Sequence, residues 1–113
     1  MSYQIHLTQD ALQDLQDIDD YIIHHDSPEN ADYVLGEIEK VINKLTELPE
    51  RGSFPEELLV LGIKEYREVY FKPYRIIYRI LNRNGDDRIY VYFIADGRRD
   101  LQSMLRRRLL ISW

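Results

Sequence analysis

The sequence contains no cysteine among its 113 residues. Disulfides and thiolate metal sites are therefore excluded, and the fold must rest on packing and hydrogen bonds, which suits a reducing compartment. Long apolar runs are also missing, since a segment such as Leu58–Ile63 is far shorter than the roughly 20 residues of a membrane span. The N-terminus lacks the basic start and apolar core of a signal peptide. We therefore expect a cytoplasmic protein that is neither secreted nor membrane-spanning.

Positive charge is scarce in the first half of the chain. Residues 1–63 carry 3 Lys and Arg against 14 Asp and Glu, whereas residues 64–113 carry 12 against 6. The whole chain has a formal net charge of −5. An asymmetry of this kind indicates that the two halves face different partners.

Sequence signatures of cofactor and metal sites are absent as well. The chain contains no phosphate-binding loop, nucleophile elbow, zinc motif or dinucleotide fingerprint. Its three histidines do not indicate a metal site, because His24 and His25 point to different sides of a helix and His6 is isolated on a predicted strand. We therefore expect no metal and no cofactor.

The first half of the chain predicts a strand followed by two helices. Tyr3–Leu7 alternates and is rich in strand-forming residues, and the hydroxyl of Thr8 can cap the helix that follows. Ser27 and Pro28 suit the N-cap and the first position of a second helix, which ends near Pro49. Because the turn between them is so short, the two helices should form an antiparallel hairpin. Their apolar stripes are Leu12, Leu15, Ile18 and Ile22, then Ala31, Leu35, Ile38, Ile42 and Leu45.

An acidic ridge lies opposite the apolar stripe of the first helix. Its members are spaced three or four residues apart, so they project from one side of the helix. We interpret the ridge as a solvent-exposed face rather than a site. The residues are Asp10, Asp14, Asp17 and Asp20.

The second half changes to a period of two residues, which is typical of strands. After a loop over residues 50–63, three strands form a meander with turns at Lys72-Pro73 and Asn84-Gly85, and Asp100 can cap a last helix. The strands are Lys64–Phe71, Tyr74–Leu81 and Arg88–Ala95, and the apolar residues of the last helix are Leu101, Met104, Leu105 and Leu109. The order β-α-α-β-β-β-α predicts a single α+β domain over residues 1–113. Its antiparallel-rich sheet is expected to be covered on one face by the helical hairpin and to be followed by a short C-terminal helix.

Three arginines are the first candidates for function. If Arg75 lies in the middle strand of the meander and Arg98 and Arg99 lie at the exit of the last strand, their guanidiniums can converge on one concave basic patch. Such a patch suits a phosphate or a carboxylate. In the alternative interpretation, Arg75 and Arg79 are surface residues that pair with Glu65 or Glu68.

Two further groups of side chains carry weaker signals. Arg106, Arg107 and Arg108 diverge around the last helix, where they offset the negative end of its dipole and leave contact with nucleic acid or an acidic partner open. The nine tyrosines gather largely on the predicted strands. They either pack across the strands or offer a surface on which bases stack.

The order of elements and two segments resemble a known family. The segments are Pro73–Ile80, with the sequence PYRIIYRI, and Ile94–Leu110, with the sequence IADGRRDLQSMLRRRLL. Together with the N-terminal strand and the acidic hairpin they resemble, from Tyr3 to Leu110, the ParE/RelE superfamily of toxins from bacterial type II toxin–antitoxin modules. The resemblance implies a growth-inhibiting cytoplasmic toxin with a RelE/ParE-like fold. It also implies a cognate antitoxin whose tail wraps over the toxin, with DNA reached only through that antitoxin.

The two branches of the superfamily imply different targets. RelE toxins cleave mRNA in the ribosomal A site, and two of their arginines match Arg75 and Arg99, whereas their tyrosine in the final helix is replaced here by Leu105. Leucine can neither donate nor accept a proton, and a net charge of −5 does not favour docking among ribosomal phosphates. The resemblance to ParE toxins implies a protein that lacks nuclease residues and poisons DNA gyrase by protein contact.

We therefore expect a gyrase inhibitor that is not itself an enzyme and makes no membrane contact. Its expected target contacts are Arg75, Arg98, Arg99, Arg106, Arg107 and Arg108. One alternative is a ribosome-dependent mRNA interferase, in which Arg75 and Arg99 stabilise the transition state and a tyrosine such as Tyr74 or Tyr92 transfers the proton. Another is a protein that has kept only antitoxin binding.

Overall fold

The computed structural model describes residues 2–110, and side chains as far as Arg108. Leu109, the last member of the predicted apolar stripe, therefore lies outside the described side chains. The helices and strands follow the predicted order, with one addition. They are β1 (Gln4–Leu7), α1 (Gln9–His25), α2 (Pro28–Asn43), α3 (Glu56–Leu59), β2 (Tyr66–Phe71), β3 (Tyr74–Arg83), β4 (Asp86–Asp96) and α4 (Leu101–Leu105). Two single turns, η1 (Lys44–Thr46) and η2 (Pro49–Arg51), follow α2, and a π-helical segment, η3 (Arg106–Leu110), follows α4.

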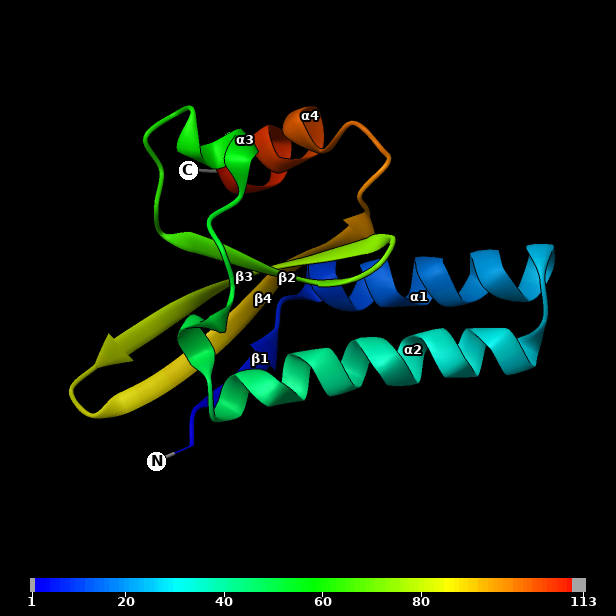
Figure 1. The fold of residues 1–113 in the computed structure, drawn as a ribbon, viewed down its shortest axis with the longest axis horizontal. Helices are drawn as coiled ribbons and strands as arrows, with labels where there is room; N and C mark the ends of the chain where they lie inside the picture. The colour runs from blue at the N-terminus through cyan, green and yellow to red at the C-terminus, as the bar shows by residue number, and fades with distance from the viewer. Residues whose placement is uncertain (1, 111–113) are drawn as a thin grey trace.

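The four strands form one mixed sheet in the order β1-β4-β3-β2, shown in Figure 1. β1 pairs parallel with β4, and the other neighbours pair antiparallel. The turn between β3 and β4 places Asn84 at φ 53° and Gly85 at φ 80°, which two-residue hairpins of type I′ require. The Asn-Gly pair therefore predicted this hairpin correctly.

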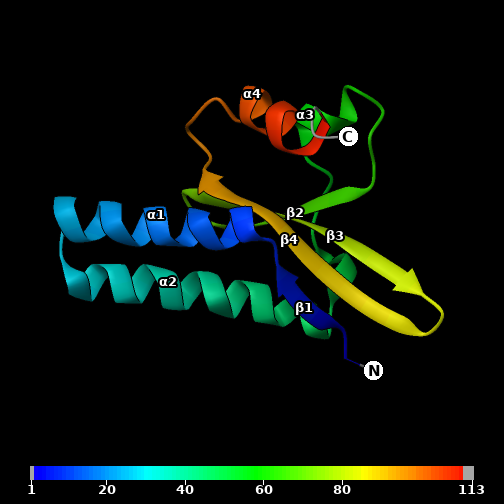
Figure 2. The same cartoon turned by 180° about the vertical axis from the view of Figure 1, so that it is seen from behind.

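Helices cover both faces of the sheet (Figures 1 and 2). The α1–α2 hairpin packs on one face, where Ile38 and Ile42 of α2 meet Ile76 and Tyr78 of β3. On the other face, α3 and α4 enclose a smaller core, made of Leu58, Tyr66, Ile77, Phe93, Ala95, Leu101 and Leu105. The α+β class is confirmed, but the prediction of a loop throughout residues 50–63 missed α3, because a single turn is too short to show an apolar period.

Three predicted helix caps are present. The hydroxyl of Thr8 accepts a hydrogen bond from the amide of Ala11 at 3.1 Å, and that of Ser27 accepts one from Asn30 at 3.1 Å. Asp100 accepts a longer one, 3.4 Å, from Ser103.

None of the helices within residues 2–110 has the length and apolar character that a membrane span needs.

Asp14 corrects the interpretation of the acidic ridge. Its carboxylate accepts a hydrogen bond of 2.9 Å from the amide of Ile94 and pairs with the guanidinium of Arg108 at 2.6 Å, and its side chain is only 12% exposed. β1 pairs with β4 only as far as Val91, so Asp14 supplies an acceptor where the neighbouring strand has ended. One member of the acidic ridge, Asp14, is thus a structural anchor.

Leu12, which was expected in the buried stripe of the same helix, is 53% exposed.

Replacing Asp14 with alanine should lower the free energy of unfolding by roughly 2–3 kcal/mol, because the change removes the acceptor of both the Ile94 amide and the Arg108 guanidinium. Urea unfolding followed by circular dichroism measures the difference. Asp20→Ala is the matched control on an exposed position of the same helix and should change stability by less than about 0.5 kcal/mol. Equal unfolding midpoints for Asp14→Ala and the unaltered protein would contradict the anchor.

Candidate functional site

Arg75 lies in β3 beneath α3, where two carboxylates hold its guanidinium. Nε and Nη2 donate to Glu68 at 2.9 and 2.8 Å, and Nη1 and Nη2 donate to Glu57 at 2.6 and 2.7 Å. The side chain of Glu68 is 2% exposed and that of Arg75 is 12% exposed. The hydrogen bonds with Glu57 raise the pKa of Arg75, and the same bonds lower the pKa of the Glu57 carboxyl. Four of the five N–H donors of the guanidinium are thus engaged within the protein.

The cavity beside Arg75 is acidic. It measures about 370 Å³, and its charged lining consists of Arg75 with Glu56, Glu57 and Glu68. Tyr70 also lines it, and burial raises the pKa of this tyrosine to about 12, with the carboxylate of Glu68 contributing. A proton donor with so high a pKa is poorly matched to acid–base catalysis at neutral pH.

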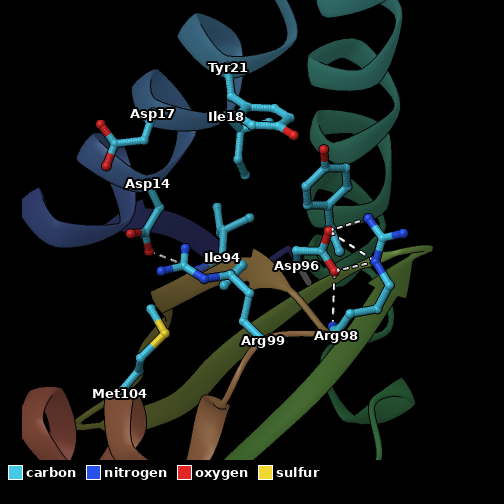
Figure 3. Close-up of a pocket in the computed structure, with 11 residues that line it drawn as sticks. Asp14, Asp17, Ile18, Tyr21, Ile94, Asp96, Arg98, Arg99 and Met104 are labelled. Carbon is cyan, nitrogen blue, oxygen red and sulfur yellow. Dashed lines mark hydrogen bonds and ion pairs between the residues drawn. The ribbon is translucent and has the colours of Figure 1, made fainter. Parts of the chain in front are cut away.

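A second cavity of about 440 Å³ lies between α1 and the end of β4 (Figure 3). Asp96, at the end of β4, accepts hydrogen bonds from the backbone amide and the Nε of Arg98, each at 2.9 Å. The Arg98 guanidinium lowers the pKa of the Asp96 carboxyl. The lining residues are Asp14, Asp17, Ile18, Tyr21, Tyr74, Ile94, Ala95, Asp96, Arg98, Arg99 and Met104.

The expectation that Arg75, Arg98 and Arg99 converge on one basic patch is wrong. Arg98 and Arg99 line the cavity at α1, whereas Arg75 lines the acidic cavity beneath α3. Gly97, in the loop after β4, lies against Arg75, because an added Cβ at this glycine would lie 2.9 Å from Cδ of Arg75. Glycine therefore lets the loop after β4 pass over the stem of Arg75. The alternative pairing of Arg75 with Glu68 is confirmed, although the pair is buried rather than on the surface.

The arginines that follow α4 also separate into two kinds. Arg108 is bound to Asp14, and its Cζ lies 4.7 Å from the ring centroid of Phe93. Arg106 and Arg107 are exposed. Leu105, at the position of the RelE tyrosine, is 1% exposed and belongs to the smaller core. Neither the sequence period nor the charge pattern distinguishes Arg108 from its neighbours, because its acceptor is supplied by α1.

Several tyrosines pack within the fold. The rings of Tyr66 and Tyr92 meet edge to face at 5.5 Å between centroids. The hydroxyl of Tyr78 donates to the carbonyl of Pro49 at 2.6 Å and accepts from the amide of Gly52 at 3.1 Å. These contacts agree with the packing interpretation of the strand tyrosines. Within the described part of the chain, no three His, Cys, Asp or Glu side chains are grouped so as to hold a metal ion.

The mixed four-stranded sheet has a helical hairpin on one face and a short C-terminal helix on the other, and this is the fold of ParE/RelE toxins. The sequence model of the ParE toxin of the type II toxin–antitoxin system parDE matches residues 5–101. The chain belongs to this family, and it is the toxin of a type II toxin–antitoxin system.

Solved structures share this fold at low sequence identity. The chromosomal ParDE toxin–antitoxin system from P. aeruginosa matches with a TM-score of 0.68 and 18% identity, over 84% of this chain and 96% of that chain. The toxin–antitoxin complex RelBE2 from Mycobacterium tuberculosis gives 0.60 and 16%, over 85% and 99%. A mutant of the E. coli toxin RelE in the free state gives 0.64 and 15%, over 97% and 100%. Among curated proteins, none is significantly similar in sequence.

Glu57→Gln should flatten the dependence of stability on pH in acid. The pKa of Glu57 is lower in the folded protein than in the unfolded chain, so its contribution is present above about pH 4.3 and is lost as the pH falls through the folded-state value. Urea unfolding at several pH values between about 2 and 6 measures the free energy of unfolding. As the pH falls, this free energy should decrease less steeply for the variant than for the unaltered protein. The control is Glu56→Gln, an exposed neighbour in the same turn, which should follow the unaltered protein. Parallel curves for Glu57→Gln and the unaltered protein would contradict the ion pair.

Proposed function

We propose that this toxin inhibits DNA gyrase by protein contact, without cleaving nucleic acid, and that a cognate antitoxin neutralises it. The observation that carries the proposal is the engagement of Arg75, the counterpart of a RelE nuclease arginine, by Glu57 and Glu68. A phosphate would have to displace two carboxylates from a buried, bidentate arrangement to reach this guanidinium. Removing either partner of such a pair leaves a buried charge unpaired, which is strongly unfavourable.

The groups that would transfer protons in RNA cleavage also favour this proposal. Cleavage needs one group to activate the 2′-hydroxyl and another to protonate the leaving oxygen, and each contributes on the order of 10²–10⁴ in rate. Leu105 is buried and has no exchangeable proton, and the pKa of Tyr70 is about 12. Arg99 lines a different cavity from Arg75, so the two arginines that match RelE do not face one phosphate.

In this proposal the exposed arginines after β4 make the target contacts. Arg98, Arg99, Arg106 and Arg107 are exposed, and they belong to the basic half of the chain. Arg75 and Arg108 instead serve the fold, because their guanidiniums are bound to carboxylates of α3, β2 and α1. An antitoxin as partner is supported by the family and by the ParDE and RelBE2 systems, whose toxin chains share the fold.

Purified toxin should inhibit supercoiling by DNA gyrase or accumulate cleaved DNA in a plasmid assay. Changing both Arg106 and Arg107 to Gln should weaken inhibition several-fold, because exposed charges at an interface steer association. Arg83→Gln is the matched control, an exposed arginine at the distant β3–β4 hairpin. Unaltered supercoiling at micromolar excess of toxin would refute gyrase as the target.

A ribosome-loaded reporter mRNA should remain uncut by the same preparation, because the residues needed for proton transfer are missing or poorly matched. Primer extension across the message measures cleavage. Cuts that depend on translation, and that disappear when Arg75 and Arg99 are both changed to Ala, would instead establish the mRNA interferase suggested by the RelE-like fold. That outcome would overturn the non-catalytic proposal even if the toxin also bound gyrase.

A further inference from the structure

We propose that a band of basic side chains beside β2, the edge strand opposite β1, binds the phosphate backbone of duplex DNA, so that the toxin contacts the DNA that gyrase holds. The inference rests on the proposed function only in its choice of DNA as the source of the phosphates. It goes beyond that function because it assigns a second contact surface, separate from the arginines after β4. The members of this basic band are Lys44, Arg51, Lys64, Arg67 and Arg79.

Two cavities beside β2 bring the members of the basic band together. The cavity at the start of the strand measures about 230 Å³, and its lining residues are Lys64, Glu65, Arg67, Arg79 and Ile80. The cavity at the end of the strand measures about 420 Å³, and its lining residues are Val41, Lys44, Arg51, Ser53, Glu68, Val69 and Tyr70. Cations therefore outnumber carboxylates in both linings.

Arg67 connects the two cavities. It lines the first one, and its Nη1 donates to the carbonyls of Glu50 and Gly52 at 3.2 and 2.9 Å. These are the residues on either side of Arg51, which lines the second cavity. Ser53 exchanges two backbone hydrogen bonds with β2, of 3.1 and 2.7 Å, so the loop that carries Arg51 lies along the strand (Figure 1). The basic band is therefore continuous from one cavity to the other.

The charges of the basic band are not neutralised by carboxylates of the fold. Arg67 has neutral partners, since its Cζ also lies 4.6 Å from the ring centroid of Phe54, and the Cζ of Arg79 lies 6.0 Å from the ring centroid of Tyr66. Glu68, which lines the second cavity, is bound to Arg75. Within residues 2–108, the cations paired with a carboxylate are Lys40, Arg75, Arg88, Arg98 and Arg108. None of these belongs to the basic band, so its positive charge is available to a ligand.

The length and the polarity of the basic band favour a nucleic acid over a single anion or a peptide. β2 has 6 residues, so it is about 20 Å long at about 3.3 Å per residue. One strand of DNA presents a phosphate about every 3.4 Å along the helix axis, so cations spread over this length meet several phosphates. A free anion would occupy only one cavity. Interfaces with DNA are also more polar and much more positively charged than those between proteins.

The net charge of −5 does not oppose this contact. Exposed charges are largely screened beyond about 10 Å at 0.1 M salt, so the local charge decides. The acidic ridge lies on α1, which packs against β4, two strands away from β2. The basic band instead belongs to η1, η2, β2, β3 and the residues just before β2.

The test measures binding of the purified toxin to a fluorescein-labelled DNA duplex by fluorescence anisotropy at several salt concentrations. Arg51→Gln combined with Lys64→Gln removes one exposed cation from each cavity. This double variant should weaken binding by about tenfold or more and reduce the slope of log affinity against log salt by about 2, because each phosphate contact contributes about 0.9. The matched control is Arg106→Gln with Arg107→Gln, which removes the same charge after α4 and should bind the duplex as the unaltered toxin does. Thermal unfolding checks that each variant is folded.

Four results would overturn the inference. The first is no binding of the duplex by the unaltered toxin at micromolar concentration in low salt, and the second is an equal loss of affinity in the two double variants. The third is binding of inorganic phosphate, seen in amide NMR shifts of the basic band, without binding of the duplex, which would show a site for a free anion. The fourth is tighter binding of single-stranded RNA than of the duplex, which would assign the basic band to RNA.

Gyrase is absent from this assay, so the two proposals fail separately. Duplex binding through the basic band by a toxin that leaves gyrase unaffected would refute only the proposed function. Gyrase inhibition by a toxin that does not bind the duplex would refute only the role of the basic band.

Discussion

The ion pairs of Arg75 with Glu57 and Glu68 are the interaction on which the arrangement of the site depends. Glu68 comes from β2, Arg75 from β3 and Glu57 from α3, so one guanidinium fastens the short helix to the sheet. Because the pair is largely buried, removing any one member leaves an uncompensated charge. The carboxylates of Glu57 and Glu68 also line the cavity beneath α3 and hold the guanidinium of Arg75 there. Arg98 and Arg99, after β4, line the other cavity.

A second charged contact joins α1 to β4 and to the segment after α4. Asp14 of α1 satisfies a backbone amide of β4 where β1 has ended, and it binds Arg108 beyond α4. The hairpin and the segment after α4 are therefore joined through Arg108, which pairs closely with Asp14 and lies 3.9 Å from a carboxylate oxygen of Asp10. Asp14 also lines the cavity at α1, together with Arg98 and Arg99.

The arginines of the second half of the chain differ in whether carboxylates of the fold bind them. Arg75 and Arg108 hold elements together, whereas Arg98, Arg99, Arg106 and Arg107 are exposed. The basic half of the chain thus contains both structural and exposed positive charges.

The sequence alone determined the order of the elements, the Thr8, Ser27 and Asp100 caps, the Asn-Gly hairpin and the family, because these depend on local conformational preference, short-range periodicity and segment identity. Only the tertiary structure decided that Asp14 is an anchor, that α3 covers the second face, and that Arg75 and Arg99 line different cavities. The positions of Asp14 and Arg75 depend on which distant group supplies a hydrogen-bond partner, and the position of α3 depends on the apolar packing of Leu58 against the sheet and α4. Asp14 and Arg108 are 94 residues apart, and Arg75 and Glu57 are 18 apart, so no local pattern reports their contact.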